Sequence, residues 1–205
     1  MCGIAGIVGS SRYEERDVKK MINIISYRGP DEQGTIHLGN VKLGHARLAV
    51  VDPENGTQPM SNHDDTVWVV FNGEIYNHLE IRTKLIQKGY KFKSRCDTEV
   101  LVHLWREKGI DMLHDLIGMF SFCIWDKNLN KGILVRDRQG IKPCYITKLK
   151  TGGFAFASEI KSILTLDGLN VEIDDEGLNL FHTFNHTPPP KTCYKNISHL
   201  MPGTY

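Results

Sequence analysis

The chain has 205 residues, 40% of them hydrophobic and 24% charged, which is the usual composition of a globular protein with a sizeable core. Its formal net charge is +1, so no basic excess favours nucleic acid or an anionic membrane surface as a partner. No apolar run approaches the roughly 20 residues that span a bilayer, and the apolar start of the chain lacks the basic segment of a signal peptide.

The first half of the chain alternates apolar runs with turn residues. A glycine-bounded run over 4–8 predicts a buried strand, and apolar residues at helical spacing predict a helix over 12–25. Further along we expect a hairpin of 34–38 and 41–45 that turns at Gly39-Asn40, an extended segment over 47–51, a strand over 67–71, and helices over 79–88 and 100–108.

The second half contains two more hairpin patterns, one pairing 120–125 with 132–135 and one pairing 145–147 with 154–157. Residues 158–166 are expected to be helical with Ser158 as the N-cap, and a short helix is expected near Leu178 to Phe184 before a run of prolines. Because the strands cluster as hairpins, the sequence predicts antiparallel sheets with helices packed outside, and not a regular parallel α/β sheet.

The five cysteines favour a reducing environment. Their number is odd and no C-x-x-C pair occurs, so the sequence supports neither a zinc ribbon nor a thioredoxin-like site. We therefore expect a cytoplasmic protein with free thiols, with Cys123 in the core. The nine histidines show no metal-ligand spacing, and none is assigned to catalysis.

Cys2 stands where the initiator Met1 is commonly removed, because the residue after it is small. The new first residue would then carry both a thiol and a free α-amino group. A thiol needs a base to become a nucleophile, and a terminal amine with a reference pKa of about 7.7 to 8.0 can be that base. Cys2 is thus a candidate nucleophile, although a small residue at the start of a strand is the simpler explanation.

Seven motifs occur in one order along the chain: Met1-Cys2-Gly3-Ile4-Ala5-Gly6, Arg28-Gly29-Pro30-Asp31, Arg47-Leu48-Ala49-Val50-Val51-Asp52, Asn72-Gly73-Glu74-Ile75-Tyr76-Asn77, Cys96-Asp97-Thr98-Glu99, Asp137-Arg138-Gln139-Gly140-Ile141-Lys142-Pro143 and Ala157-Ser158-Glu159-Ile160-Lys161. Together they resemble the glutaminase domain of class II glutamine amidotransferases, and specifically that of glutamine-hydrolysing asparagine synthetase. The resemblance covers nearly the whole chain.

The resemblance implies an α+β fold, the four-layer αββα sandwich of N-terminal-nucleophile hydrolases, with two antiparallel sheets between outer helices. It implies a glutaminase domain over 1–173 and a C-terminal extension over 174–205 that leads toward an absent synthetase domain. L-Glutamine is the implied substrate. No cofactor is implied for this domain, since ATP and Mg would serve only the synthetase domain. A homo-oligomer is compatible with the sequence.

The resemblance also implies a mechanism. Cys2 would attack the side-chain amide of glutamine to give a thioester and ammonia, with its own amine accepting the proton through a water. The tetrahedral intermediate carries an oxyanion that needs preorganised hydrogen-bond donors. The Asn72 side-chain amide and the Gly73 backbone N–H are the implied donors. Asn-Gly is otherwise a common hairpin turn, but the residues after it do not resemble a return strand.

Further residues are expected to hold the two charged ends of the substrate. Arg47 suits the α-carboxylate, since a guanidinium can pair bidentately, and Glu74 and Asp97 suit the α-ammonium. Backbone groups around Val50 are implied to contribute, over Leu48, Ala49, Val50 and Val51. The ordinary alternatives are a solvated strand-end arginine for Arg47 and a helix N-cap for Asp97, which can combine capping with facing a pocket.

Two further motifs are expected to be structural. Arg28 and Asp31 are expected to order the loop near Cys2, and residues 137–143 to form a turn with ion pairs at a sheet end. Two other functions stay open: the same glutaminase half serving a sugar or secondary-metabolite acceptor, and a noncatalytic regulatory module that keeps the fold.

Overall fold

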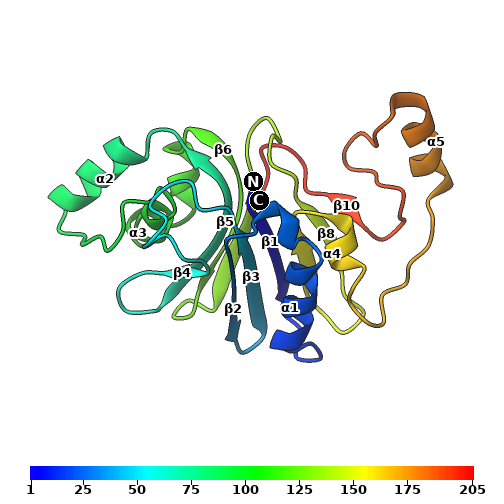
Figure 1. Ribbon diagram of the computed structural model, residues 1–205, viewed down its shortest axis with the longest axis horizontal. Helices are drawn as coiled ribbons and strands as arrows, with labels where there is room; N and C mark the ends of the chain where they lie inside the picture. Colours follow the sequence, from blue (N-terminus) through cyan, green and yellow to red (C-terminus); the bar gives the residue numbers. More distant parts are fainter.

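The computed structural model describes residues 1–205, and its framework is two antiparallel sheets that lie face to face (Figure 1). Sheet A has the strand order β10-β8-β9-β1-β3-β2, with bounds β1 Gly3–Val8, β2 Glu32–Leu38, β3 Val41–Arg47, β8 Tyr145–Lys148, β9 Phe154–Ala157 and β10 Ser198–His199. Sheet B has the order β4-β5-β6-β7, with bounds β4 Met60–Ser61, β5 Val67–Ile75, β6 Gly118–Asp126 and β7 Lys131–Arg136.

The three predicted hairpins are confirmed. β2 and β3 pair up to Leu38 opposite Val41, and Gly39 supplies the positive φ of 63° that this turn needs. β6 pairs with β7, and β8 pairs with β9, each across a polar or glycine-rich loop. Residue pairing within these hairpins therefore follows from local turn chemistry.

Helices cover the outer face of each sheet, which gives four layers and confirms the predicted αββα architecture (Figure 1). α1 (Glu15–Asn23) and α4 (Ile160–Ile163) pack on sheet A. α2 (His78–Gln87), α3 (Thr98–Lys108) and the 3-10 helix η2 (Gly109–His114) pack on sheet B. A second 3-10 helix, η1 (Ser26–Arg28), follows α1.

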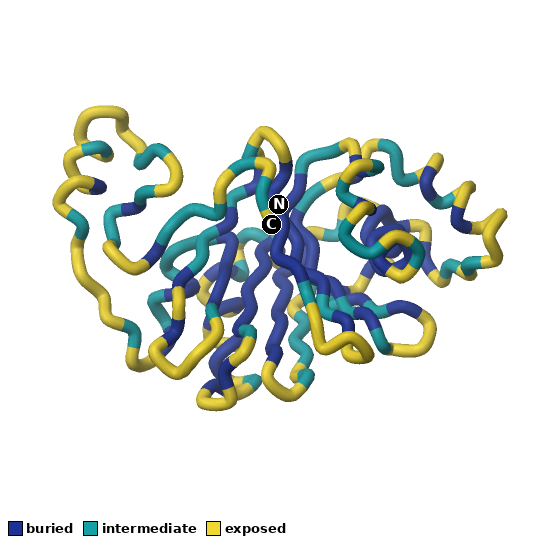
Figure 2. The backbone as a smooth tube through the Cα atoms, turned by 180° about the vertical axis from the view of Figure 1, so that it is seen from behind, coloured by how far each residue is buried: buried dark blue, intermediate teal, exposed yellow.

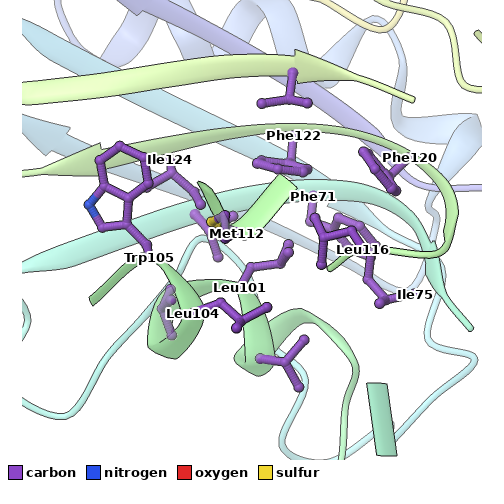
Figure 3. Close-up of a cluster of buried hydrophobic side chains, with 14 of the residues drawn as sticks. Phe71, Ile75, Leu101, Leu104, Trp105, Met112, Leu116, Phe120, Phe122 and Ile124 are labelled. Atoms are coloured by element: carbon purple, nitrogen blue, oxygen red, sulfur yellow. The ribbon is translucent and has the colours of Figure 1, made fainter. Parts of the chain in front are cut away.

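Each interface between layers has its own apolar core. Figure 3 shows the core under α3, where Phe71 and Phe122 of sheet B meet Leu101 of the helix. The core between the two sheets is smaller and includes Ile4 of β1 and Val70 of β5. Cys123 also lies there, fully buried as predicted.

The alternation of side chains along the strands decides what lies at the sheet ends. Val70 faces sheet A, whereas Phe71 faces α3, so Asn72 is directed toward sheet A. Ile4 of β1 faces sheet B, so Cys2, two residues earlier, is directed toward sheet B. The strands β1 and β5 pack against each other, and Cys2 and Asn72 thus approach the same space between the sheets.

Residues 174–205 leave the body of the protein and return to it. α5 (Asp175–Phe184) stands apart in Figure 1, and Figure 2 shows most of this excursion as exposed. The chain then pairs β10 with β8 at the edge of sheet A. The domain boundary at 173/174 stays a prediction. None of the helices is both long and apolar enough to cross a membrane.

Three predicted elements differ from the structure. Residues 48–51 are a loop, because β2 begins at Glu32 opposite Arg47 and leaves no strand to pair with them. Ser158 does not cap a helix, since its Oγ accepts the Ile4 N–H at 3.0 Å and it extends the pairing with β1. The helix over 158–166 is reduced to α4 with turns after it, and α1 is shorter than the predicted 12–25.

We expect Phe122→Ala to destabilise the fold by about 3 to 5 kcal/mol, because it removes a fully buried ring between sheet B and α3. Urea unfolding of both chains followed by circular dichroism measures this change. Leu129→Ala, at a position that is 65% exposed, is the control and should stay within about 0.5 kcal/mol of the native chain. Equal stabilities of the two variants would contradict the packing described here.

Candidate functional site

A pocket of about 200 Å³ opens between the ends of the two sheets, near the start of the chain. It is lined by nine of the ten residues expected at a site, namely Cys2, Arg47, Leu48, Val50, Val51, Asn72, Gly73, Glu74 and Asp97. Ala49 is the exception, because its N–H is turned to the Asp31 carboxylate at 2.8 Å. Residues separated by up to 95 positions in the chain therefore meet at one place.

The Cys2 thiol lies beside Leu48, the first residue of the 48–51 loop. The Leu48 N–H points at the sulfur, with the nitrogen 3.4 Å from Sγ, and the thiol can donate to the Leu48 carbonyl oxygen 3.7 Å away. Arg28 Nε donates to the Cys2 carbonyl at 3.0 Å, and Arg28 Nη1 pairs with Glu159 at 2.9 Å. Arg28, itself fixed by Glu159, thus holds the backbone that carries the thiol in place.

The segment from Arg28 to Asp31 ties this loop to the nucleophile, as the sequence predicted. Asp31 donates its N–H to the Arg47 carbonyl at 3.1 Å and accepts the Ala49 N–H, so it spans the end of β3 and the loop after it. Gly29 passes so close to β3 that a Cβ there would lie 2.3 Å from the Ala46 carbonyl oxygen. Only glycine permits that approach.

Asn72 offers a free donor to the pocket. The residue is 1% exposed, and its Nδ2 has no hydrogen-bond partner within the protein. Buried amide nitrogens are normally paired, and leaving one unpaired is costly. An unpaired amide that lines a pocket is suited to bind an oxygen that arrives there. Asn72-Gly73 lies inside β5, so the hairpin-turn alternative is wrong.

Gly73 presents its N–H on the open edge of β5. Its cross-strand neighbour Phe120 exchanges hydrogen bonds with Asp137 on the opposite side, so Gly73 directs its N–H away from β6. On the same edge, the N–H groups of Phe71 and Ile75 donate to side chains of the pocket wall. The Gly73 N–H lies between these two and has no side-chain acceptor.

Two carboxylates, those of Asp97 and Glu74, also line the pocket. Asp97 is 6% exposed, and burial raises the pKa of its carboxyl, although the Ile75 N–H, 2.9 Å from Oδ2, works against that rise. Asp97 occupies the N-cap position of α3 but makes no side-chain cap bond, so the alternative of a side-chain N-cap is wrong. Glu74 is exposed at the pocket rim and is free to meet a cation.

Arg47 faces the pocket but is fully engaged in this structure. Its Nη1 donates to Glu32 at 3.1 Å and to the Pro53 carbonyl at 2.7 Å, and its Nη2 donates to the Asp52 carbonyl at 2.8 Å. The side chain is buried, so it is not the solvated arginine of the simpler alternative. A carboxylate bound at Arg47 would have to take the place of one of these loop carbonyls.

Glu99, in the first turn of α3, holds the segment that carries Asp97. Its carboxylate accepts the N–H groups of Lys93 and Ser94 at 2.7 and 2.8 Å and the Ser94 hydroxyl at 2.6 Å. Burial alone would raise the pKa of Glu99, but these bonds and the neighbouring His103 outweigh it and lower the pKa to about 2.

Sequence reasoning did not assign eight other lining residues to the pocket, namely Met1, Gly56, Gln58, Phe71, Cys96, Thr98, Met119 and Lys142. Cys96 could have been found, since it precedes Asp97. Lys142 is 6% exposed, forms no salt bridge, and places its Nζ 3.3 Å from the Met1 sulfur. Lys142 belongs to the 137–143 motif, which was expected to be structural, and the packing of the loop after β7 brings it to the pocket.

The ion pairs expected within residues 137–143 are absent. Asp137 instead accepts backbone N–H groups, including those of Gln139 and Lys142, both at 3.0 Å. Arg136 and Arg138 donate to backbone carbonyls. In this turn no neighbouring strand satisfies the backbone N–H and C=O groups. The charged side chains satisfy these groups instead, so they pair with the backbone and not with one another.

Elsewhere, a larger hollow of about 510 Å³ lies between β8 and the chain around 169–171 and 194–198. It has no cysteine and no unpaired buried donor of the kind found at Asn72. No group of three or more His, Cys, Asp or Glu side chains is arranged to hold a metal ion. All five cysteines are free thiols.

Comparison with known sequences gives a consistent result. A family model described as a glutamine amidotransferase domain matches residues 1–205. Asparagine synthetase [glutamine-hydrolyzing] 1 of Bacillus subtilis is 39% identical over 209 residues, which cover 100% of this chain and 33% of that protein. Asparagine synthetase [glutamine-hydrolyzing] 2 of the same organism is 47% identical over 172 residues, covering 80% of this chain and 22% of that protein. The chain thus spans a third or less of these relatives.

Solved structures share the fold. The glutamine phosphoribosylpyrophosphate (PRPP) amidotransferase from B. subtilis, complexed with ADP and GMP, superposes with a TM-score of 0.69 at 21% identity, over 80% of this chain and 43% of that one. A structure described as the allosteric regulatory enzyme of purine biosynthesis gives 0.70 at 21% identity, with the same coverage. At this identity the likeness establishes the sandwich fold alone.

We expect Glu99→Gln to remove a pH-dependent part of the stability. The pKa of Glu99 is lowered from 4.5 to about 2, so its contribution, up to about 3 kcal/mol, is present above pH 4.5 and is lost as the pH falls toward 2. Urea unfolding of the native and variant chains between pH 7 and pH 3 should show the difference shrinking with acid. Glu80→Gln, at an exposed position on α2, should show no such trend, and a constant Glu99 difference would contradict the assignment.

Proposed function

The chain belongs to the glutamine amidotransferase domain family, and from this premise we propose that it hydrolyses L-glutamine to L-glutamate and ammonia through a thioester on Cys2. One observation carries the proposal: a thiol, an unpaired buried amide and an open backbone N–H line the same small pocket, from Cys2, Asn72 and Gly73. This is the set of groups that acyl transfer from an amide requires.

The chemistry follows from these groups. The Cys2 thiolate attacks the side-chain amide carbon of glutamine, and the resulting oxyanion is held by Asn72 Nδ2 and the Gly73 N–H. The intermediate then collapses to the γ-glutamyl thioester, and the leaving nitrogen departs as ammonia with the proton that the α-amino group had accepted from the thiol. A water attacks the thioester in the same pocket and releases glutamate, which restores the thiol.

Removal of Met1 is part of this proposal. Met1 lines the pocket in the structure, and its amide bond to Cys2 ties up the nitrogen that would serve as the base. Excision of Met1 would free that nitrogen as an amine on the same residue as the thiol. It would also expose the Lys142 ammonium, which now contacts the Met1 sulfur, to the pocket.

The ends of the pocket fit an α-amino acid. Asp97 and Glu74 would pair with the α-ammonium, and Arg47 with the α-carboxylate. The backbone of Leu48, Val50 and Val51, which lines the opening, would close over the substrate. A substrate carboxylate would compete for Arg47 with the Pro53 and Asp52 carbonyls. Binding of substrate in the pocket would therefore change the position of the loop that carries these carbonyls.

We further propose that the intact protein is an asparagine synthetase, in which the ammonia reaches a synthetase domain that uses ATP and Mg²⁺. The support is that the relatives bear that name and that this chain matches only a third or less of their length. A sugar or secondary-metabolite acceptor is the alternative that assays of the intact protein would reveal. The five free thiols support a reducing, cytoplasmic setting.

We expect Asn72→Ala to lower kcat for glutamate release by about 10² to 10³, the usual effect of removing one oxyanion donor. The measurement is glutamate formation from glutamine by chains lacking Met1. Cys2→Ala should be inactive and should not be labelled by a glutamine-analogue electrophile, whereas Asn72→Ala should retain the reactive thiol. Asn128→Ala, the same change in an exposed turn, should match the native rate.

The result that would overturn the proposal is equally specific. If the native chain releases no glutamate and the electrophile does not label Cys2, the protein is a noncatalytic module. If Asn72→Ala is as fast as Asn128→Ala, the donor role of Asn72 is wrong.

A further inference from the structure

His45 connects the two sheets next to the pocket. It lies on β3 of sheet A, directly opposite Ile4 of β1, and is 0% exposed. Its Nε2 is 3.0 Å from the carbonyl oxygen of Phe71 on β5 of sheet B. The bond thus runs from the sheet that carries Cys2 to the residue that immediately precedes Asn72.

The protonation state of His45 follows from its surroundings. Burial lowers its pKa to about 4, against the opposing effect of the hydrogen bond to Phe71, so the imidazole is neutral near pH 7. A carbonyl oxygen can only accept, and Nε2 therefore carries the single ring proton. Nδ1 is left as a buried acceptor without a partner.

That unpaired nitrogen indicates that His45 is not there for stability alone. A leucine could fill a buried site between apolar strands without the cost of an unsatisfied polar atom. The neighbouring inward positions of β1 and β3 are indeed apolar, at Ile4 and Leu43. The histidine is explained by the one bond that it makes.

The hydrogen bond from His45 holds the edge of β5 at a point where no neighbouring strand pairs with that edge. β4 pairs with β5 only at Met60 opposite Val69 and Ser61 opposite Trp68. At Phe71, farther along the same edge, side chains take over: Gln58 Oε1 accepts the Phe71 N–H at 2.7 Å, and His45 donates to the Phe71 carbonyl. The next two residues are the donors Asn72 and Gly73.

We propose that His45 is a positioning residue that fixes the Asn72 and Gly73 donors relative to the Cys2 thiol. The inference rests on the proposed glutaminase function and deepens it. The thiol and the donors come from different sheets, so their distance depends on contacts between the sheets. The hydrogen bond from His45 to the Phe71 carbonyl lies one residue away from the donors and sets that distance. Misplacement of a catalytic group by about 1 Å can lower a rate by about 10²-fold.

The test compares three variants of the 205-residue chain, each after removal of Met1. His45→Leu has no donor, His45→Asn has an amide donor that is too short to reach Phe71, and His45→Gln has an amide donor of comparable reach. We expect the Leu and Asn variants to lose about 10- to 100-fold in kcat with KM within about twofold, and the Gln variant to stay within about threefold of the native kcat.

A second readout separates positioning from general damage. Alkylation of Cys2 by iodoacetamide, followed on the N-terminal peptide by mass spectrometry, needs the thiolate but no oxyanion donor. We expect its rate to be unchanged within about twofold in all three variants, since only the donors move. Parallel loss of kcat and of alkylation, or equal kcat in the Asn and Gln variants, would refute the positioning role. The Asn–Gln comparison serves if the Leu variant fails to fold.

A third readout does not depend on turnover. Amide hydrogen exchange in a peptide that covers residues 71–75 should be faster in the Asn variant than in the Gln variant, with a peptide from the middle of β6 unchanged. Equal exchange over 71–75 would refute the inference whatever the activities. A native chain that releases no glutamate would instead refute the proposed function, so the two failures can be told apart.

Discussion

The contact between the ends of two β-sheets is the constraint on which the site depends. Cys2 extends β1 of sheet A, whereas Asn72 and Gly73 belong to β5 of sheet B, and neither sheet alone contains the proposed set of reacting groups. The apolar core between the sheets sets their separation, and the His45 bond to Phe71 adds a directional link close to the pocket. Apolar packing alone is non-directional, so a polar link is suited to define the last few tenths of an ångström.

The pocket is prepared to receive charge. Asn72 Nδ2 has no partner, and the Gly73 N–H is directed outward because the strand opposite uses Asp137 on its far side. In a protein that pairs most of its buried polar groups, these donors cost stability in the empty pocket. An oxygen that enters the pocket can satisfy them, and the proposed oxyanion would accept stronger hydrogen bonds from them than a neutral carbonyl oxygen.

Local pattern accounts for the hairpins and for the residue types of the site, and tertiary packing accounts for the rest. The β2–β3 turn could be predicted because Gly39-Asn40 is a two-residue turn between alternating strands. The full length of β5 could not, because Asn72-Gly73 has the local chemistry of a turn and is kept extended by pairing with β6. The contacts that Lys142 and His45 make near the pocket could not be predicted either, since they follow from how loops and sheets meet.

The proposed mechanism requires that Cys2 is acylated during turnover. Rapid acid quenching of the chain with glutamine, followed by mass spectrometry of the N-terminal peptide, tests it most directly, and Asn72→Ala offers a matched chain in which acylation should be slower. We expect a peptide that begins at Cys2 and carries one γ-glutamyl group, with none on the other cysteines. Two results would contradict the mechanism. One is glutamate release without that adduct at any quench time, and the other is glutamate release from chains that retain Met1.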